Sequence, residues 1–274
     1  MHTSTVDRLI TLTRRGDADL AEAAALIDAT FNATVDVDVA LLRIEALADQ
    51  VRTELTATQP EDKARQIAAI LHTTHGFSGQ TGSSHSAASA AFLTSVLDTR
   101  DGLPILLTIV YVAVARRLGV AAYAIHLPGH VVAGIPTAEG VPLVIDMFFG
   151  GEELDEEGVR QRVRMRGGAD ATLHRALMRP RSSADVTRRI LHNLTRAFTN
   201  AREPFAALLT VEVKLALANT NPQDHKLHGD LLLACGQFDV AAEAYERFLT
   251  RGNPSARINT HVRQQVIAAR ARLN

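Results

Sequence analysis

The most constraining feature of this chain is a long run of apolar residues that no surface helix would carry. Residues 103–119 read LPILLTIVYVAVARRLG, and nearly every position up to Ala115 is apolar. A helix that is apolar all round is buried in a core, and Gly119 is suited to cap its end. The run is shorter than the roughly 20 residues that span a bilayer. The chain therefore predicts a buried helix with a domain packed around it.

Composition and charge indicate an ordinary soluble protein. The 274 residues are 46% apolar and carry a formal net charge of −1. Nucleic-acid and membrane-surface proteins usually carry more positive charge, and the one basic stretch, RQRVRMR at residues 160–166, is interpreted as a solvated helix face. The only cysteine, Cys235, leaves no internal disulfide and favours a reducing compartment. We expect a cytoplasmic protein without nucleic-acid or membrane partners.

Helical patterns precede the buried helix. Residues 17–31, 38–55 and 59–77 each repeat apolar side chains at helical spacing. The third segment has Pro60 just inside its start and Gly76 just past its end, which is the usual asymmetry of helix ends. The first hundred residues are therefore predicted to be a helical region.

The C-terminal segment has the spacing of a tetratricopeptide repeat. Four residues carry it: Gly229, Gly236, Ala241 and Tyr245. Ala207 lies one 34-residue period before Ala241, so about one and a half repeats precede a last helix at 260–273. We predict two domains, residues 1–183 and residues 184–274.

Two β-rich segments follow the buried helix. Residues 120–135 and 141–151 flank a turn candidate, PTAEG, at 136–140. If the strands pair around this turn, His130 lies directly opposite Asp146, on the same face of an antiparallel sheet.

The His130–Asp146 pair also follows from burial. Both faces of the predicted sheet are mostly apolar, so Asp146 is costly to bury without a partner, and His130 is the nearest one. A bulge at Pro128–Gly129 would instead place the two side chains on opposite faces.

The order of these motifs resembles the bacterial SirB-type branch of the transglutaminase-like superfamily. The pattern is R-x-G-x-P-I, Y, A-R-R-L-G, P-G-H and I-D-x-F-x-G-G. It is carried by Arg100, Gly102, Pro104, Ile105, Tyr111, Ala115, Arg116, Arg117, Leu118, Gly119, Pro128, Gly129, His130, Ile145, Asp146, Phe148, Gly150 and Gly151. The resemblance implies an α+β fold: a helical N-terminal region, a transglutaminase-like (papain-like) core with an antiparallel sheet, and C-terminal tetratricopeptide-type helices.

The resemblance also implies a triad whose nucleophile is missing here. A cysteine at the start of the buried helix would act with a histidine and an aspartate on consecutive strands, and His130 and Asp146 match the last two. The helix start has no cysteine. Thr108 is the nearest hydroxyl, but it is far harder to deprotonate than a thiol, and Cys235 is interpreted as a packed small residue of the repeat segment.

Three hypotheses about function are compatible with the sequence. The first is a non-catalytic protein that binds a protein or peptide partner through the groove around His130 and Asp146, the repeat helices, or both. The second is a hydrolase or transferase of amide bonds that uses the dyad with a non-cysteine nucleophile. The third is a metal site at His72, His75 and His85, for which surface histidines are the simpler interpretation. No cofactor is expected.

Overall fold

The apolar run forms a buried helix in the computed structural model of the chain, as predicted. The structure describes residues 2–15, 18–79, 88–168, 173–217, 221–252 and 255–272. Helix α6 (Pro104–Arg117) has every side chain from Ile105 to Ala115 buried, and Gly119 after its end has a φ of 80°. Among the described helices, none has both the length and the apolar character needed to cross a bilayer.

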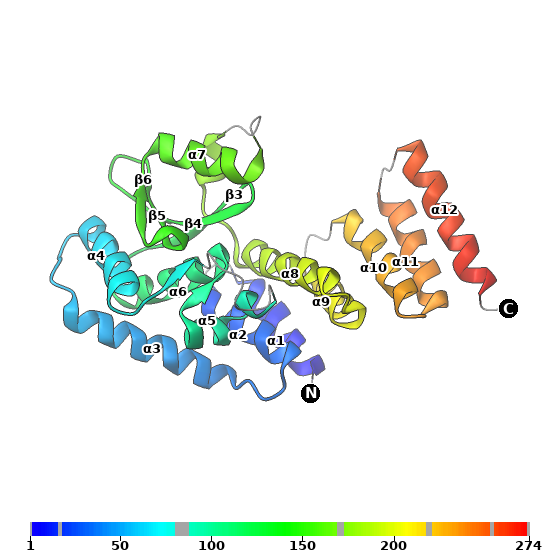
Figure 1. The fold of residues 1–274 in the computed structure, drawn as a ribbon, viewed down its shortest axis with the longest axis horizontal. Helices are drawn as coiled ribbons and strands as arrows, with labels where there is room; N and C mark the ends of the chain where they lie inside the picture. Colours follow the sequence, from blue (N-terminus) through cyan, green and yellow to red (C-terminus); the bar gives the residue numbers. More distant parts are fainter. Residues whose placement is uncertain are drawn as a thin grey trace. The chain divides into compact units, whose positions relative to one another are not determined.

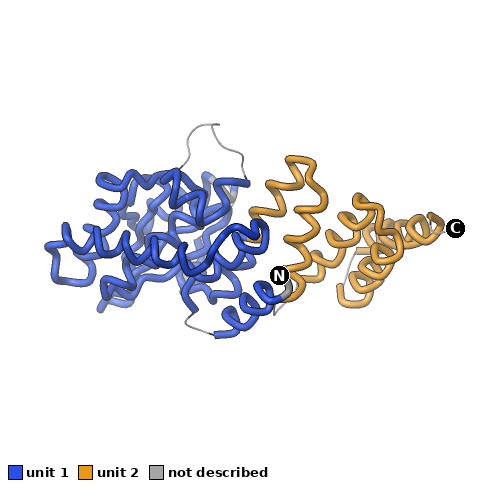
Figure 2. Tube along the Cα trace, turned by 90° about the horizontal axis from the view of Figure 1, so that it is seen from below, with its two compact units in different colours: residues 1–190 blue, residues 191–274 orange. Residues whose placement is uncertain are grey.

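The chain divides into two compact units, residues 1–190 and residues 191–274 (Figure 2). The division lies inside α8 (Ser183–Asn200). The boundary predicted from the sequence, at 183/184, coincides with the start of this helix.

The first unit combines helices with two small sheets. Its other helices are α1 (His2–Thr13), α2 (Leu20–Phe31), α3 (Val37–Glu54), α4 (Pro60–Thr73), α5 (Leu93–Thr99) and α7 (Glu156–Gly167), with 3₁₀ turns η1 (Ser89–Ala91), η2 (Met147–Phe149) and η3 (Arg175–Met178). Its strands are β1 (Ser78–Gly79), β2 (Asp101–Gly102), β3 (Tyr123–Leu127), β4 (His130–Ile135), β5 (Leu143–Asp146) and β6 (Glu152–Leu154). Strands β1 and β2 pair in parallel, and β3–β4–β5–β6 form an antiparallel sheet in that order.

The four-stranded sheet is covered on both faces, as its apolar pattern predicts. Figure 1 shows the sheet between α7 and α6. On the α7 side, Val132 and Val144 of the sheet belong to one apolar cluster with Val159 and Val163 of the helix. This explains why strand β4 is buried at every position.

The bulge considered at Pro128–Gly129 is wrong, because these residues form the turn of a tight hairpin. Leu127, the last residue of β3, pairs with His130, the first residue of β4, and Gly129 has a φ of 68°. A glycine adopts this left-handed conformation without a Cβ penalty. The hairpin makes His130 the first residue after the turn.

The predicted register of the next hairpin is wrong by two residues. Ala133 pairs with Ile145 and Ile135 with Leu143, so His130 is not directly opposite Asp146. The loop extends to Pro142, since proline has no backbone N–H for the ladder. A shift of two residues keeps every side chain on its face of the sheet, so the expectation of a shared face survives.

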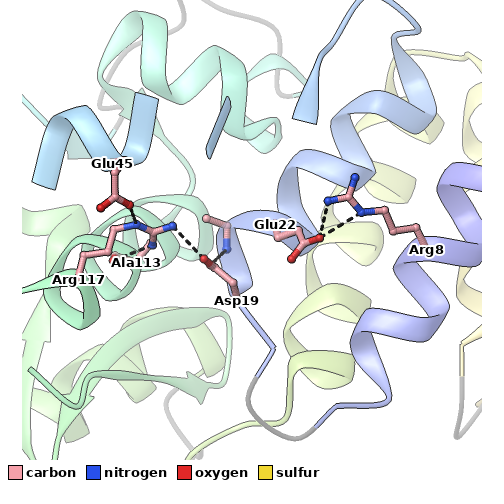
Figure 3. A network of polar contacts seen from close by, with 7 residues as sticks. Arg8, Asp19, Glu22, Glu45, Ala113 and Arg117 are labelled. Carbon is pink, nitrogen blue, oxygen red and sulfur yellow. Dashed lines mark hydrogen bonds and ion pairs between the residues drawn. The ribbon is translucent and has the colours of Figure 1, made fainter. Parts of the chain in front are cut away.

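Charged side chains fasten α6 to the N-terminal helices (Figure 3). Arg117, at the end of α6, donates from Nη2 to Asp19 (3.0 Å) and from Nε to Glu45 (2.6 Å). Asp19 also caps α2, since its carboxylate accepts from Ala21 N at 2.8 Å. One guanidinium therefore links the end of α6 to α3 and to the start of α2.

The start of α5 is capped by a residue distant in sequence. Its N-cap residue, Phe92, has no side chain that could accept a hydrogen bond. Asp28 of α2 serves instead and accepts from Leu93 N (3.2 Å), Thr94 N (2.7 Å) and Thr94 Oγ1 (2.8 Å). A buried carboxylate thus attaches α2 to the start of α5.

The second unit consists of packed helices. After α8 these are α9 (Pro204–Ala216), α10 (Pro222–Ala234), α11 (Phe238–Arg251) and α12 (Ala256–Ala271). Gly229 of α10 lies against the Tyr245 ring of α11, where a Cβ would approach the ring to 2.7 Å. The four residues of the repeat pattern therefore lie at the packing surface and turn of one helix hairpin: Gly229, Gly236, Ala241 and Tyr245.

Candidate functional site

His130 and Asp146 form a buried hydrogen-bonded pair. His130 begins β4 directly after the Pro–Gly turn, and Asp146 ends β5. Nε2 of His130 lies 2.9 Å from Oδ2 of Asp146, and both side chains are 0% exposed. The structure therefore brings together the two residues that the sequence pairs, through a diagonal placement on the sheet.

Asp146 has two further partners, neither of which was predicted from the sequence. Arg162 of α7 donates from Nε to Oδ2 at 2.9 Å, and the backbone N–H of Phe148 donates to Oδ1 at 3.1 Å. Arg162 is only 8% exposed and also pairs with Glu152. The interpretation of residues 160–166 as a solvated face is therefore wrong for Arg162, which shares the buried face of α7 with Val159 and Val163.

Two phenylalanines cover the polar cluster. The His130 ring lies 5.8 Å from that of Phe148 and 6.0 Å from that of Phe149, between centroids. The guanidinium of Arg162 lies over the Phe149 ring, 4.2 Å from its centroid, a cation–π geometry. Gly150 and Gly151 follow with φ of 75° and 78°, and Gly151 N donates to Asp146 O at 3.0 Å. Residues 148–151 thus form a short turn that folds back over His130 and Asp146.

The hydrogen bonds fix the orientation of the imidazole. Arg162 can only donate, so the carboxylate of Asp146 accepts, and the Nε2 of His130 is assigned as a donor. In the neutral ring Nδ1 then carries the lone pair. It is buried and has no hydrogen-bond partner among the residues that the structure describes. This nitrogen is the one that could accept a proton from a reactant.

Thr108, the weak candidate nucleophile, has another hydrogen-bond partner. The hydrogen bonds and ring contacts of His130 and Asp146 join them to each other, to η2 and to α7. The transglutaminase-like resemblance implies a contact with the start of α6 instead. Thr108 is fully buried in α6 and donates its hydroxyl to the carbonyl of Val131 at 3.3 Å. Cys235 is the C-cap residue of α10 in the second unit, where burial raises the pKa of its thiol, which disfavours the reactive thiolate.

The histidines considered for metal binding have other roles where they are described. Nδ1 of His72 hydrogen-bonds to the backbone oxygen of Phe77 at 3.1 Å. Nε2 of His75 lies 3.9 Å from Oε1 of Glu54. His85 lies outside the described residues. Within the described part of the chain, no group of three or more His, Cys, Asp or Glu side chains is arranged to hold a metal ion.

His126 is a half-buried histidine with a lowered pKa, which predicts acid sensitivity. Burial and the nearby Arg189 and Arg181 lower its pKa to about 4, although Asp185 opposes the shift. Since the ordinary pKa is near 6.5, the unfolded chain takes up this proton first, and stability falls as the pH drops from about 6.5 to 4. We expect His126→Gln to remove on the order of 1–2 kcal/mol of that loss.

The free energy of unfolding of the wild-type protein and of His126→Gln is measured from about pH 6.5 to about pH 4. His261→Gln, at an exposed histidine of α12, serves as the control and should keep the wild-type pH dependence. Parallel pH profiles for wild type and His126→Gln would contradict the prediction.

Comparisons with known proteins identify the family of the chain. Residues 39–192 match the family model of the Transglutaminase-like superfamily. A "UPF0162 protein" of Xylella fastidiosa (strain Temecula1) is 32% identical over 162 residues, 58% of this chain and 57% of that protein. "UPF0162 protein PA3419" of Pseudomonas aeruginosa is 28% identical over 159 residues, 57% of this chain and 56% of the relative. The matches span little more than half the length of these relatives.

A solved structure of menin, whose title says that it reveals the binding site for the Mixed Lineage Leukemia protein, is also similar. It aligns with 98% of this chain and 68% of its own, at 10% identity and a TM-score of 0.46. A similarity this distant supports no argument about the present chain.

Proposed function

Because the chain belongs to the transglutaminase-like superfamily, we propose that it is a non-catalytic member that binds a protein or peptide partner. In this proposal the His130–Asp146 pair is a structural element inherited from a catalytic arrangement. It holds the β4–β5 hairpin to α7 and no longer serves a nucleophile.

The observation that carries the proposal is the closure of the pair. The side chains of His130 and Asp146 are 0% exposed, and Arg162 occupies the carboxylate as a second donor. A general base must come within hydrogen-bond reach of the proton that it removes. A fully covered imidazole in a protein whose α6 begins without a cysteine does not meet that requirement.

An assay of amide turnover tests the proposal. Purified protein is incubated with pools of peptide and side-chain amides, with and without an added primary amine, and released ammonia and new amide bonds are measured by mass spectrometry. We expect no turnover above the buffer control. Turnover that His130→Gln abolishes while its melting temperature stays at the wild-type value would overturn the proposal.

One observation favours the enzyme as a second candidate. Nδ1 of His130 is buried without a hydrogen-bond partner among the described residues, and such groups usually require a functional or solvent explanation. An activated water could occupy the role of the missing thiol, with His130 accepting its proton. The amide assay separates the two candidates.

We further propose that the chain belongs to the SirB-type branch and that α9–α12 are tetratricopeptide-type helices. The Gly229–Tyr245 packing and the left-handed Gly236 support this assignment. Repeat helices commonly present an extended surface to a partner, so this unit is a second candidate for partner binding, in a cytoplasmic protein.

A further inference from the structure

A pocket of about 510 Å³ opens in the first unit next to the polar cluster. Its walls come from the 136–142 loop, strands β5 and β6, and the starts of α4 and α7. The volume lies within the range of ligand sites in proteins. Neither His130, Asp146 nor Arg162 lines it, so it is distinct from the site described above.

The floor of the pocket is apolar and continuous with the core. Val144 and Leu154, which pair across β5 and β6, line it together with Val159 of α7. These three residues belong to the cluster that holds α7 on the sheet. Val141, on the loop at the rim, is an exposed apolar side chain, 66% accessible to solvent. An occupant therefore gains stability by burying apolar groups here.

The rim of the pocket is acidic. Arg65 is the one basic residue among the described residues that line it. Five carboxylates line it as well: Glu61, Glu139, Glu153, Asp155 and Glu156. Arg65 already pairs with two acids, since its Nε donates to Glu153 at 2.7 Å and its Nη1 to Asp62 at 3.1 Å. Glu156 is paired as well, with Arg160 of the same helix. Glu61, Glu139 and Asp155 are the rim carboxylates without an ion pair among the described residues. The rim therefore favours a positively charged occupant and disfavours a negatively charged one.

The shape of the wall favours an extended peptide over a small amine. Strand β6 lies at the edge of the sheet, and its residues Glu153 and Leu154 form part of the pocket wall. An edge strand can pair with an added strand, while pockets beside it accept alternate side chains. The acids on this short edge disfavour pairing with a like-charged strand and match a basic one.

We propose that this pocket binds an extended peptide segment of a partner protein in which basic side chains alternate with apolar ones. The inference rests on the proposed partner-binding function and names the chemistry of the partner. Apolar side chains enter over Val144, Leu154 and Val159, and lysine or arginine side chains meet the acidic rim. The pocket lies two residues from Asp146 along β5, so the clasp of His130, Asp146 and Arg162 stiffens one wall.

Fluorescence anisotropy of the full chain with three labelled hexapeptides tests the proposal. The probe alternates lysine with leucine; one control alternates glutamate with leucine, and the other alternates lysine with serine. We expect saturable binding of the probe that weakens at high salt, with both controls bound at least about tenfold more weakly. Absence of saturable binding of the probe, or equal binding of the glutamate–leucine peptide, would overturn the proposal.

Two variants and a matched control locate the binding. Val141→Lys and Glu139→Lys change exposed rim residues to the charge of the probe and should each weaken its binding about tenfold. Leu42→Glu changes a leucine of α3 that is 67% exposed and does not line the pocket, and it should bind as wild type does. Melting curves verify that all three fold. Unchanged binding by both rim variants, or equal weakening by Leu42→Glu, would overturn the assignment to this pocket.

The outcomes of this experiment and of the amide assay are distinguishable. Amide turnover together with rim-dependent peptide binding would refute the non-catalytic proposal and leave the peptide site standing. Absence of both would refute the peptide site alone.

Discussion

Replacing Asp146 by alanine is expected to lower the free energy of unfolding by about 3–5 kcal/mol, because the change leaves the buried side chains of His130 and Arg162 without their shared acceptor. Arg162 would lose the carboxylate to which its Nε donates, and His130 would lose the one hydrogen-bond partner that its side chain has among the described residues. Native-state hydrogen exchange of the β4 and β5 amides measures the effect in the first unit. The control is Glu156→Ala in α7, the helix that carries Arg162. It removes an exposed ion pair with Arg160 and should change the free energy of unfolding by no more than about 0.5 kcal/mol.

A double variant distinguishes the cost of losing the Asp146 hydrogen bonds from the cost of leaving the Arg162 cation buried without its partner. Asp146→Ala combined with Arg162→Met removes the buried charge as well as its partner, and it should be less destabilised than Asp146→Ala alone. Additive losses in the double variant, or a cost below about 1 kcal/mol for Asp146→Ala, would show that His130, Asp146 and Arg162 do not stabilise the sheet against α7.

Replacing Asp28 by alanine is expected to cost about 2–3 kcal/mol, because two N–H groups at the start of α5 lose their acceptor. The cost is limited by the burial of the carboxylate itself, which raises its pKa to about 6 despite three hydrogen bonds. Urea denaturation at neutral pH measures the change. Amide exchange should accelerate most in α5.

The control for this variant is Asp38→Ala. Asp38 is an exposed acid in the first turn of α3, and its side chain is 80% exposed. Its loss should cost less than about 0.5 kcal/mol. Equal effects of the two substitutions would mean that Asp28 does not hold α5 in place.

Much of the first unit could be predicted from local patterns. The all-round apolar run at 103–119 required a buried helix, and α6 is one. The two-sided apolar pattern of the strands required a sheet covered on both faces. These inferences succeed because helical and strand periods are properties of the backbone that each segment expresses on its own.

The candidate site was predicted in part. His130 and Asp146 were paired because a buried aspartate needs a partner, and the two side chains do meet at 2.9 Å. Arg162 could have been found as well, since it follows Val159 by three residues and precedes Val163, on the apolar face of its helix. Its position within a basic run concealed that it points inward.

Asp28 shows why some features could not be predicted. It is 65 residues from Leu93, and no short-range pattern marks it as the cap of another helix. Likewise, the acidic rim of the pocket collects residues from α4, the 136–142 loop, β6 and α7. Such groupings depend on how elements pack, which the sequence expresses only through the complete fold.

The sequence by itself determined the buried helix, the covered sheet, and the identity of the histidine and aspartate that share a face. Only the tertiary structure decided the register of the β4–β5 hairpin, the third partner of Asp146 and the closure of the site by Phe148 and Phe149. The physical reason is that side-chain alternation fixes a face within each strand. The partner across a loop or from another helix is instead fixed by loop length and packing, since Pro142 lengthens the loop and α7 brings Arg162 to the sheet.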